Sequence, residues 1–141
     1  MNKNSGKATN FLNFETGQMT KEEIEAIFNS LPVDVTFVDS EDKVRFFSQT
    51  KDRIFPRTKA VIGREVQNCH PQKSVHIVNK ILEDFKKGKR NLAEFWIQMD
   101  GRFIYIRYFS VQNMQGDYLG CLEVTQDISE LMKLKGEKKL L

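Results

Sequence analysis

Hydrophobic and polar residues alternate between residues 90 and 129 in a pattern that predicts three consecutive antiparallel strands. Asp100-Gly101 is a two-residue hairpin signal, because a type I′ turn requires positive φ at both central positions. This turn pairs Glu94 with Arg107 across the first two strands. The first hairpin therefore has a defined register.

The second turn is less regular, and we place its centre at Gln115, which pairs Phe109 with Cys121 and Arg107 with Glu123. Because side chains alternate along a strand, the two registers divide the sheet into two faces. One face is almost wholly apolar and carries Phe95, Ile97, Ile104, Ile106, Tyr108, Leu122 and Val124. The other carries aromatic side chains, one cysteine and a row of charges: Trp96, Tyr105, Phe109, Cys121, Glu94, Arg107 and Glu123.

The row of charges has two interpretations. A guanidinium between two carboxylates on an aromatic surface supplies the few convergent polar groups that a small-molecule pocket contains. The same row is also what ion pairs across an exposed sheet look like. The residues alone leave both interpretations open.

The preceding half of the chain predicts two helices and two further strands. A capping box over residues 20–23 begins a short helix with an apolar stripe that ends at Pro32. Residues 33–38 and 43–49 predict two strands, and the broken pattern over 50–69 predicts short helical turns and loops that cover a cavity. A long helix is expected from Pro71 to Gly88, and a last helical start over 128–134.

This order predicts the α+β class, with a five-stranded antiparallel sheet, helices covering one face and an additional N-terminal amphipathic helix. We expect a flexible lead over residues 1–18, one domain over 19–134 with its core at about 30–133, and a charged tail over 135–141.

Composition excludes several functional classes. With 22 basic and 19 acidic residues the net charge is +3, which is too balanced to favour nucleic acid. No segment has the roughly 20 apolar residues of a membrane span, so we expect a cytoplasmic protein without a membrane partner. Cys69 and Cys121 lack the spacing of a zinc site or a disulfide framework.

The order of elements resembles the PAS sensor domain over about residues 30–133. The first strand ends on Asp39 before a turn, Gly63-Arg64 is followed by His70-Pro71, and Gly120 precedes the closing stretch QDISE over 126–130. More closely, the chain resembles the PAS module of bacterial proteins that also carry a hemerythrin-like domain and a DUF438 domain. That resemblance implies a signalling part of a larger polypeptide. It carries over no metal site, because hemerythrin-type iron ligands are missing from the sequence.

PAS domains of different families bind haem, flavin, small metabolites or nothing. Flavin is disfavoured, because the chain has Thr125 where light sensors have Gln and shares with them only Asn68-Cys69. Haem remains an alternative, but the helical arc of the long helix places His76 toward solvent, and His70 lies in a loop. No cofactor is therefore assigned.

In similar PAS domains the position of Thr125 points into the cavity. The resemblance therefore implies a pocket lined by Glu94, Trp96, Tyr105, Arg107, Phe109, Cys121, Glu123 and Thr125. The apolar opposite face would then dock the first helix or a second subunit.

We accordingly predict a sensor module that binds a small molecule or a partner protein and transmits the change through its sheet and terminal helices. It is not expected to be an enzyme, because no nucleophile and base pair or phosphate loop is visible. The alternatives are a ligand-free dimerisation module and a haem-based gas or redox sensor. A homodimer is expected, with an interface that includes Ile24, Ile27, Phe28 and Leu31.

Overall fold

The computed structural model describes residues 10–141, which form seven strands and two α-helices. In chain order these are β1 (Phe11–Phe14), β2 (Gly17–Thr20), α1 (Lys21–Ser30), β3 (Asp34–Asp39), β4 (Val44–Phe47), α2 (Val75–Lys86), β5 (Leu92–Met99), β6 (Arg102–Gln112) and β7 (Tyr118–Asp127). Short 3-10 helices occupy Lys59–Val61, Val66–Cys69, Gln72–Ser74 and Leu131–Lys133.

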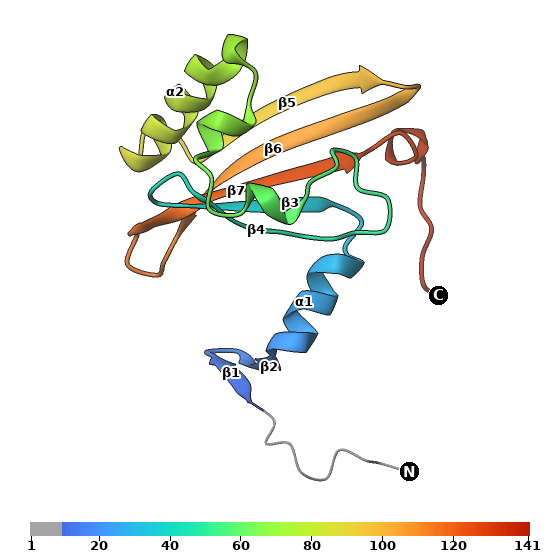
Figure 1. The fold of residues 1–141 in the computed structure, drawn as a ribbon. Coiled ribbons are helices and arrows are strands. Elements are labelled where there is room, and N and C mark those ends of the chain that lie inside the picture. Colours follow the sequence, from blue (N-terminus) through green and yellow to red (C-terminus); the bar gives the residue numbers. More distant parts are fainter. Residues whose placement is uncertain (1–9) are drawn as a thin grey trace.

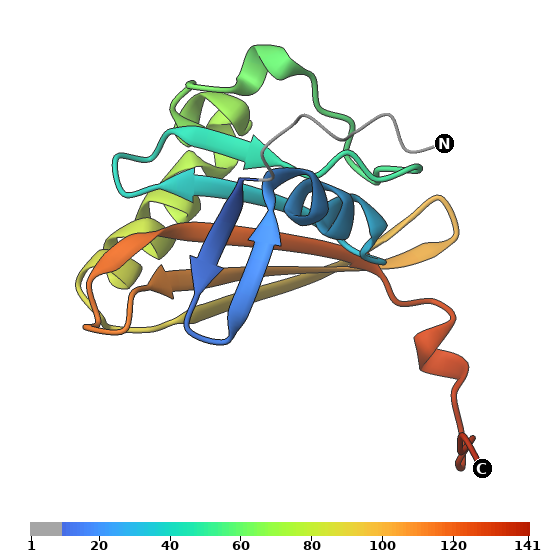
Figure 2. The ribbon, with the colours of Figure 1, turned by 90° about the horizontal axis from the view of Figure 1, so that it is seen from below.

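Five strands form one antiparallel sheet in the order β4-β3-β7-β6-β5. The segment 50–74 and α2 cover one side of it, here called the inner face, whereas α1 and the β1–β2 hairpin lie on the other side, the outer face (Figures 1 and 2). The predicted α+β class with a five-stranded antiparallel sheet is confirmed. The last strand along the chain, β7, lies at the centre of the sheet.

The Asp-Gly hairpin has the predicted register. Asp100 and Gly101 have φ values of 52° and 76°, and Glu94 pairs with Arg107. Positive φ at both central residues is what a type I′ turn requires. The local chemistry of this turn therefore determines how β5 aligns with β6.

The predicted register between β6 and β7 was wrong, because of a β-bulge. Next to the turn, Gln112 pairs with Tyr118, as a turn centred on Gln115 requires, but the following pair is Val111 with Gly120. Leu119 is thus an extra residue in β7, and a bulge of this kind shifts every later pair by one residue. A shift of one residue exchanges the two faces of a strand.

The bulge changes which residues of β7 share a face with β6. Phe109 pairs with Leu122 and not with Cys121, and Arg107 pairs with Val124 and not with Glu123. The inner face therefore combines Phe95, Ile97, Ile104, Ile106 and Tyr108 with Cys121, Glu123 and Thr125. The outer face combines Glu94, Trp96, Tyr105, Arg107 and Phe109 with Leu122 and Val124.

The N-terminal elements agree in part with the sequence-based expectation. The capping box of α1 is present, with Glu23 N–H donating to Thr20 Oγ1 at 3.1 Å and Thr20 N–H donating to the Glu23 carboxylate at 2.9 Å. Residues 11–18, expected to belong to a flexible lead, instead form most of the β1–β2 hairpin. Residues 1–9 of that lead lie outside the described part of the chain.

The long helix begins later than expected, because its first turn is the 3-10 helix Gln72–Ser74. Its apolar arc packs on the inner face, where Ile81, Leu82 and Phe85 are buried against Val38 and other core residues. The helical start expected over 128–134 is reduced to the 3-10 helix Leu131–Lys133. Within residues 10–141, neither α-helix has the length and apolar character needed to cross a membrane.

Gly120, at the bulge, is a position where a side chain cannot be accommodated. Its φ is 155°, and a Cβ atom there would lie 2.1 Å from the Val38 carbonyl oxygen and 2.8 Å from the Phe37 ring.

Gly120→Ala should therefore lower the free energy of unfolding by more than about 2 kcal/mol, since the backbone of β3 or β7 would have to move. Gly116→Ala is the control, because Gly116 also has positive φ but has open space around it. It should cost about 1 kcal/mol. Urea unfolding of both variants measures the difference, and equal losses would contradict the close approach.

Candidate ligand-binding cavity

A cavity of about 250 Å³ lies between the inner face of the sheet, α2 and the segment 50–74. Most of its wall is aliphatic, aromatic or thiol: Val38, Val44, Val66, Cys69, Ile77, Val78, Ile81, Leu82, Phe95, Ile106 and Cys121. Strands β3 to β7 and α2 all contribute to this wall. The segment over 50–69 thus covers a cavity, as its broken pattern predicted.

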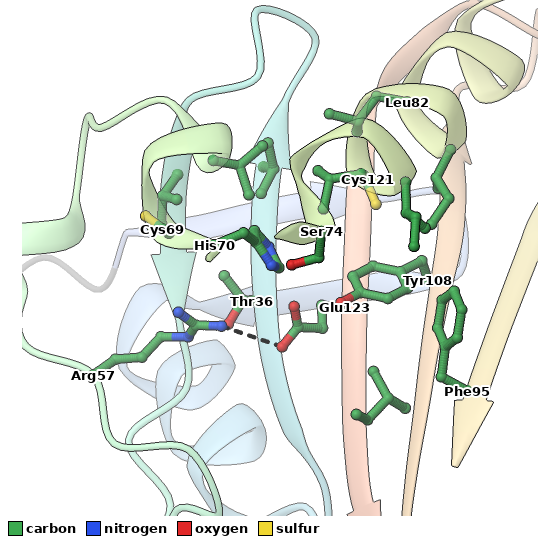
Figure 3. A pocket seen from close by; sticks show the side chains of 17 residues that line it. Thr36, Arg57, Cys69, His70, Ser74, Leu82, Phe95, Tyr108, Cys121 and Glu123 are labelled. Carbon is green, nitrogen blue, oxygen red and sulfur yellow. Dashed lines mark hydrogen bonds and ion pairs between the residues drawn. The ribbon is translucent and has the colours of Figure 1, made fainter. Parts of the chain in front are cut away.

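Six polar side chains complete the wall: Thr36, Arg57, His70, Ser74, Tyr108 and Glu123. Figure 3 shows them around the Glu123 carboxylate, with Arg57 on one side of it and Tyr108 on the other. Arg57 Nη2 lies 3.2 Å from Glu123 Oε1, and the two side chains are only 17% and 12% exposed. The cavity therefore has an apolar body and a polar end that contains one nearly buried ion pair.

Arg57 is held in place by the segment that precedes it. Arg53 donates to the carbonyl oxygens of Ser48 and Phe55 at 3.0 and 2.9 Å and to Thr36 Oγ1 at 2.9 Å. Asp34 Oδ2 accepts from the backbone N–H of Ile54 at 2.7 Å. These contacts join the irregular segment to β3. They bring Arg57 to Glu123, which lies next to Thr36 across the β3–β7 ladder.

Burial favours the uncharged forms of Tyr108, Cys121 and His70. It raises the pKa of the Tyr108 phenol, with further contributions from the charge of Glu123 and a hydrogen bond to it. It raises the pKa of the Cys121 thiol to about 12. It lowers the pKa of His70, an effect that Glu123 opposes and Arg57 reinforces. The formal charges at the polar end are therefore those of Arg57 and Glu123.

Three of the eight predicted pocket residues lie on the inner face. Cys121 and Glu123 line the cavity, and Thr125 is buried beside them with its hydroxyl 3.5 Å from Glu123 Oε1. The other five, Glu94, Trp96, Tyr105, Arg107 and Phe109, lie on the outer face, so the prediction that they line the same cavity was wrong. The error arises because the bulge shifts the β6–β7 register by one residue, which exchanges the two faces of β7 relative to β6.

The predicted row of three charges is likewise divided between the two faces. On the outer face the Arg107 guanidinium lies 4.8 Å from the centre of the Tyr105 ring and 5.4 Å from that of Phe109, and the Tyr105 hydroxyl donates to Glu94. Glu123, on the inner face, pairs with Arg57 instead. Arg107 therefore stacks on aromatic rings and does not join two carboxylates.

Sequence reasoning did not identify Arg57, His70, Ser74 or Thr36 as parts of the site. It placed Phe95, Ile106 and Tyr108, which line the cavity, on the sheet face opposite the pocket. A signal for Arg57 was present, since it is a charged residue within the segment 50–69 that was expected to cover a cavity. His76 is exposed on α2, as its helical position predicted. The histidine that reaches the cavity is His70, from the loop before α2.

The Arg57–Glu123 pair predicts a large difference between two arginine substitutions. Arg57→Met should lower the free energy of unfolding by about 3 kcal/mol, because it leaves the nearly buried Glu123 carboxylate without a positive charge beside it. Arg107→Met should cost about 1 kcal/mol or less, since Arg107 is only partly buried and loses mainly contacts with aromatic rings. Urea unfolding of both variants tests this, and the opposite ranking would contradict the assignment of Glu123 to Arg57.

Comparisons with known proteins agree with this architecture. The family model PAS_10, described as a PAS domain, matches residues 24–129. The C-terminal domain of a Streptococcus mutans protein is 32% identical and superimposes with a TM-score of 0.84 over 90% of this chain and 98% of that chain. No curated protein matches the chain significantly.

More distant structures share the fold. The PAS domain of Bordetella pertussis BvgS is 16% identical, with a TM-score of 0.58 over 79% of this chain and 90% of that chain. The PAS domain of a Colwellia psychrerythraea protein is 13% identical, with a TM-score of 0.56 over 77% and 97% of the respective chains. Because the family model covers all five strands of the sheet and α2, the chain belongs to the PAS domain family.

Proposed function

We propose that this PAS domain is a sensor module that binds a small molecule in the cavity between the inner face and α2. The observation that supports the proposal is the cavity itself, which combines about 250 Å³ of largely apolar space with six polar side chains at one end. Small-molecule sites typically have apolar walls and a few polar groups that orient the ligand. A purely structural core would fill such a space with side chains.

The position of the cavity in the sheet supports a role in signalling. Two of its wall strands, β3 and β7, are neighbours, and they connect directly to the segments toward the two ends of the chain (Figure 1). The chain after β7 is held to β6, because Ile128 N–H donates to the Phe103 carbonyl oxygen at 2.9 Å and Ser129 Oγ accepts from Phe103 N–H at 2.9 Å. A ligand that moves Glu123 would thus move strands that lead to both terminal segments.

Filling the cavity should abolish binding. Val78 lines the cavity from α2, so Val78→Phe places a ring in the ligand space, whereas Val111→Phe adds the same ring to the outer face. Saturation-transfer NMR with a set of charged and uncharged benzene derivatives should detect binding to the wild type and to Val111→Phe but not to Val78→Phe. Equal signals from both variants, or none from the wild type, would contradict the proposal.

A second function, dimerisation, is supported by the apolar surface that the N-terminal elements leave exposed. On α1, Phe28 packs on Phe46 with ring centres 5.3 Å apart, but Ile27 and the C-cap residue Leu31 remain 48% and 38% exposed. The outer face leaves Trp96 63% exposed. We propose that a second copy of this chain covers these surfaces in a two-fold dimer, since each copy offers both the stripe and the sheet face. Of the four stripe residues predicted for the interface, Ile27 and Leu31 then face the partner, whereas Ile24 and Phe28 lie toward the molecule's own sheet.

A charge placed in the stripe should dissociate this dimer. Ile27→Glu should convert a micromolar dimer to monomer with little change in the fold, because Ile27 is already exposed within one chain. Ile62→Glu is the control, since Ile62 is similarly exposed at 44% but lies in the segment on the inner side of the sheet. Sedimentation equilibrium of the wild type and both variants measures the outcome. A wild type that stays monomeric at high concentration would rule out the dimer.

A further inference from the structure

The charges at the polar end of the cavity restrict which ligand can bind there, given the proposed small-molecule function. Arg57 and Glu123 carry opposite charges 3.2 Å apart, and neither side chain is more than 17% exposed. Burial leaves His70 and Tyr108 uncharged near neutral pH. The polar end thus contains one positive and one negative group that already neutralise each other.

A charged ligand would lack a free counter-charge at this end. An anion would have to compete with Glu123 for Arg57 and would lie close to the Glu123 carboxylate, where the surrounding apolar wall provides little screening. A cation would in turn have to compete with Arg57 for Glu123 and would lie close to the Arg57 guanidinium. Transferring an anionic or a cationic ligand from water into the cavity without a new counter-charge is costly in free energy.

One hydrogen-bond donor of this ion pair nevertheless lacks a partner within residues 10–141. Among the described residues, Arg57 Nε is buried and makes no hydrogen bond, although Nη2 of the same guanidinium is bound to Glu123. Buried donors are normally paired, and an unpaired one costs about 1–3 kcal/mol. A ligand oxygen that accepts from Nε would satisfy this donor without disturbing the ion pair.

The volume of the cavity limits the size of the ligand. A dry apolar cavity of about 150 Å³ accepts a benzene-sized molecule. The cavity here has about 250 Å³, enough for a ring with a substituent or a small fused bicycle.

We propose that the cavity binds an uncharged, largely apolar molecule of one or two rings that carries one hydrogen-bond acceptor, such as a carbonyl oxygen, and that this acceptor binds at Arg57. The apolar part then lies against Ile81, Leu82 and Ile106. The ion pair acts as the selective element, because it excludes charged analogues of the same shape.

Three probes of similar shape test this class. Acetophenone is uncharged with an acceptor, ethylbenzene is uncharged without one, and benzoate carries a charge. Titrations of the full chain at pH 7.5, followed by NMR shifts of the Ser74 and Cys121 amides, should give a Kd for acetophenone at least tenfold lower than for ethylbenzene or benzoate. Benzoate or ethylbenzene binding as tightly as acetophenone would overturn the proposed class but leave a small-molecule site. Failure of all three probes would contradict the small-molecule function itself.

A substitution should reverse the selectivity. Glu123→Gln keeps the shape but removes the negative charge beside Arg57, so the affinity for benzoate should rise at least tenfold while that for acetophenone changes less than threefold. Glu94→Gln, which removes a carboxylate from the outer face, is the matched control and should leave both affinities unchanged. Unchanged benzoate affinity in a folded Glu123→Gln variant would overturn the role of the ion pair. If that variant does not fold, the comparison of the three probes on the wild type still decides the ligand class.

Discussion

The cavity depends on one irregularity, the bulge at Leu119–Gly120. The extra residue in β7 turns Cys121 and Glu123 toward α2, whereas an unbroken ladder would turn them to the outer face. The bulge in turn needs a glycine, since a Cβ at residue 120 would collide with the backbone of β3. Because β7 is the central strand, its register decides the chemistry of both faces at once.

The ion pair of Arg57 and Glu123 adds little to the stability of the fold, and its main effect is on which ligands the cavity accepts. Two charges lose hydration when they are enclosed, and their attraction in a nearly buried setting does little more than offset that loss. An apolar pair of similar volume would make a tighter core. The pair gives the cavity a polar end with no net charge. Hydroxyl and imidazole groups lie around this pair, and Arg57 Nε makes no hydrogen bond with the described residues. Such an arrangement discriminates between ligands by charge more than by shape.

The two faces of the sheet are suited to different partners. The inner face encloses a small volume and offers buried polar groups, as a site for a small molecule does. The outer face is open, rich in aromatic side chains and flanked by a helix that leaves part of its apolar stripe exposed, as a protein interface does. Since both faces share the same five strands, a shift of β7 caused by a ligand on one side would alter the surface on the other.

Local interactions determined what the sequence alone predicts correctly. The capping box of α1, the Asp-Gly turn and the buried arc of α2 each depend on residues a few positions apart, so their outcome is readable from spacing. The face to which β7 turns Glu123 was decided only by tertiary structure, because the bulge reflects how Gly120 packs against Val38 and Phe37 of another strand. The partner of Glu123 was decided in the same way. Arg57 lies in an irregular segment with no periodicity. It reaches the cavity because Arg53 donates to the Val35 carbonyl oxygen and Ile54 N–H donates to the Asp34 carboxylate, and these contacts hold that segment against β3.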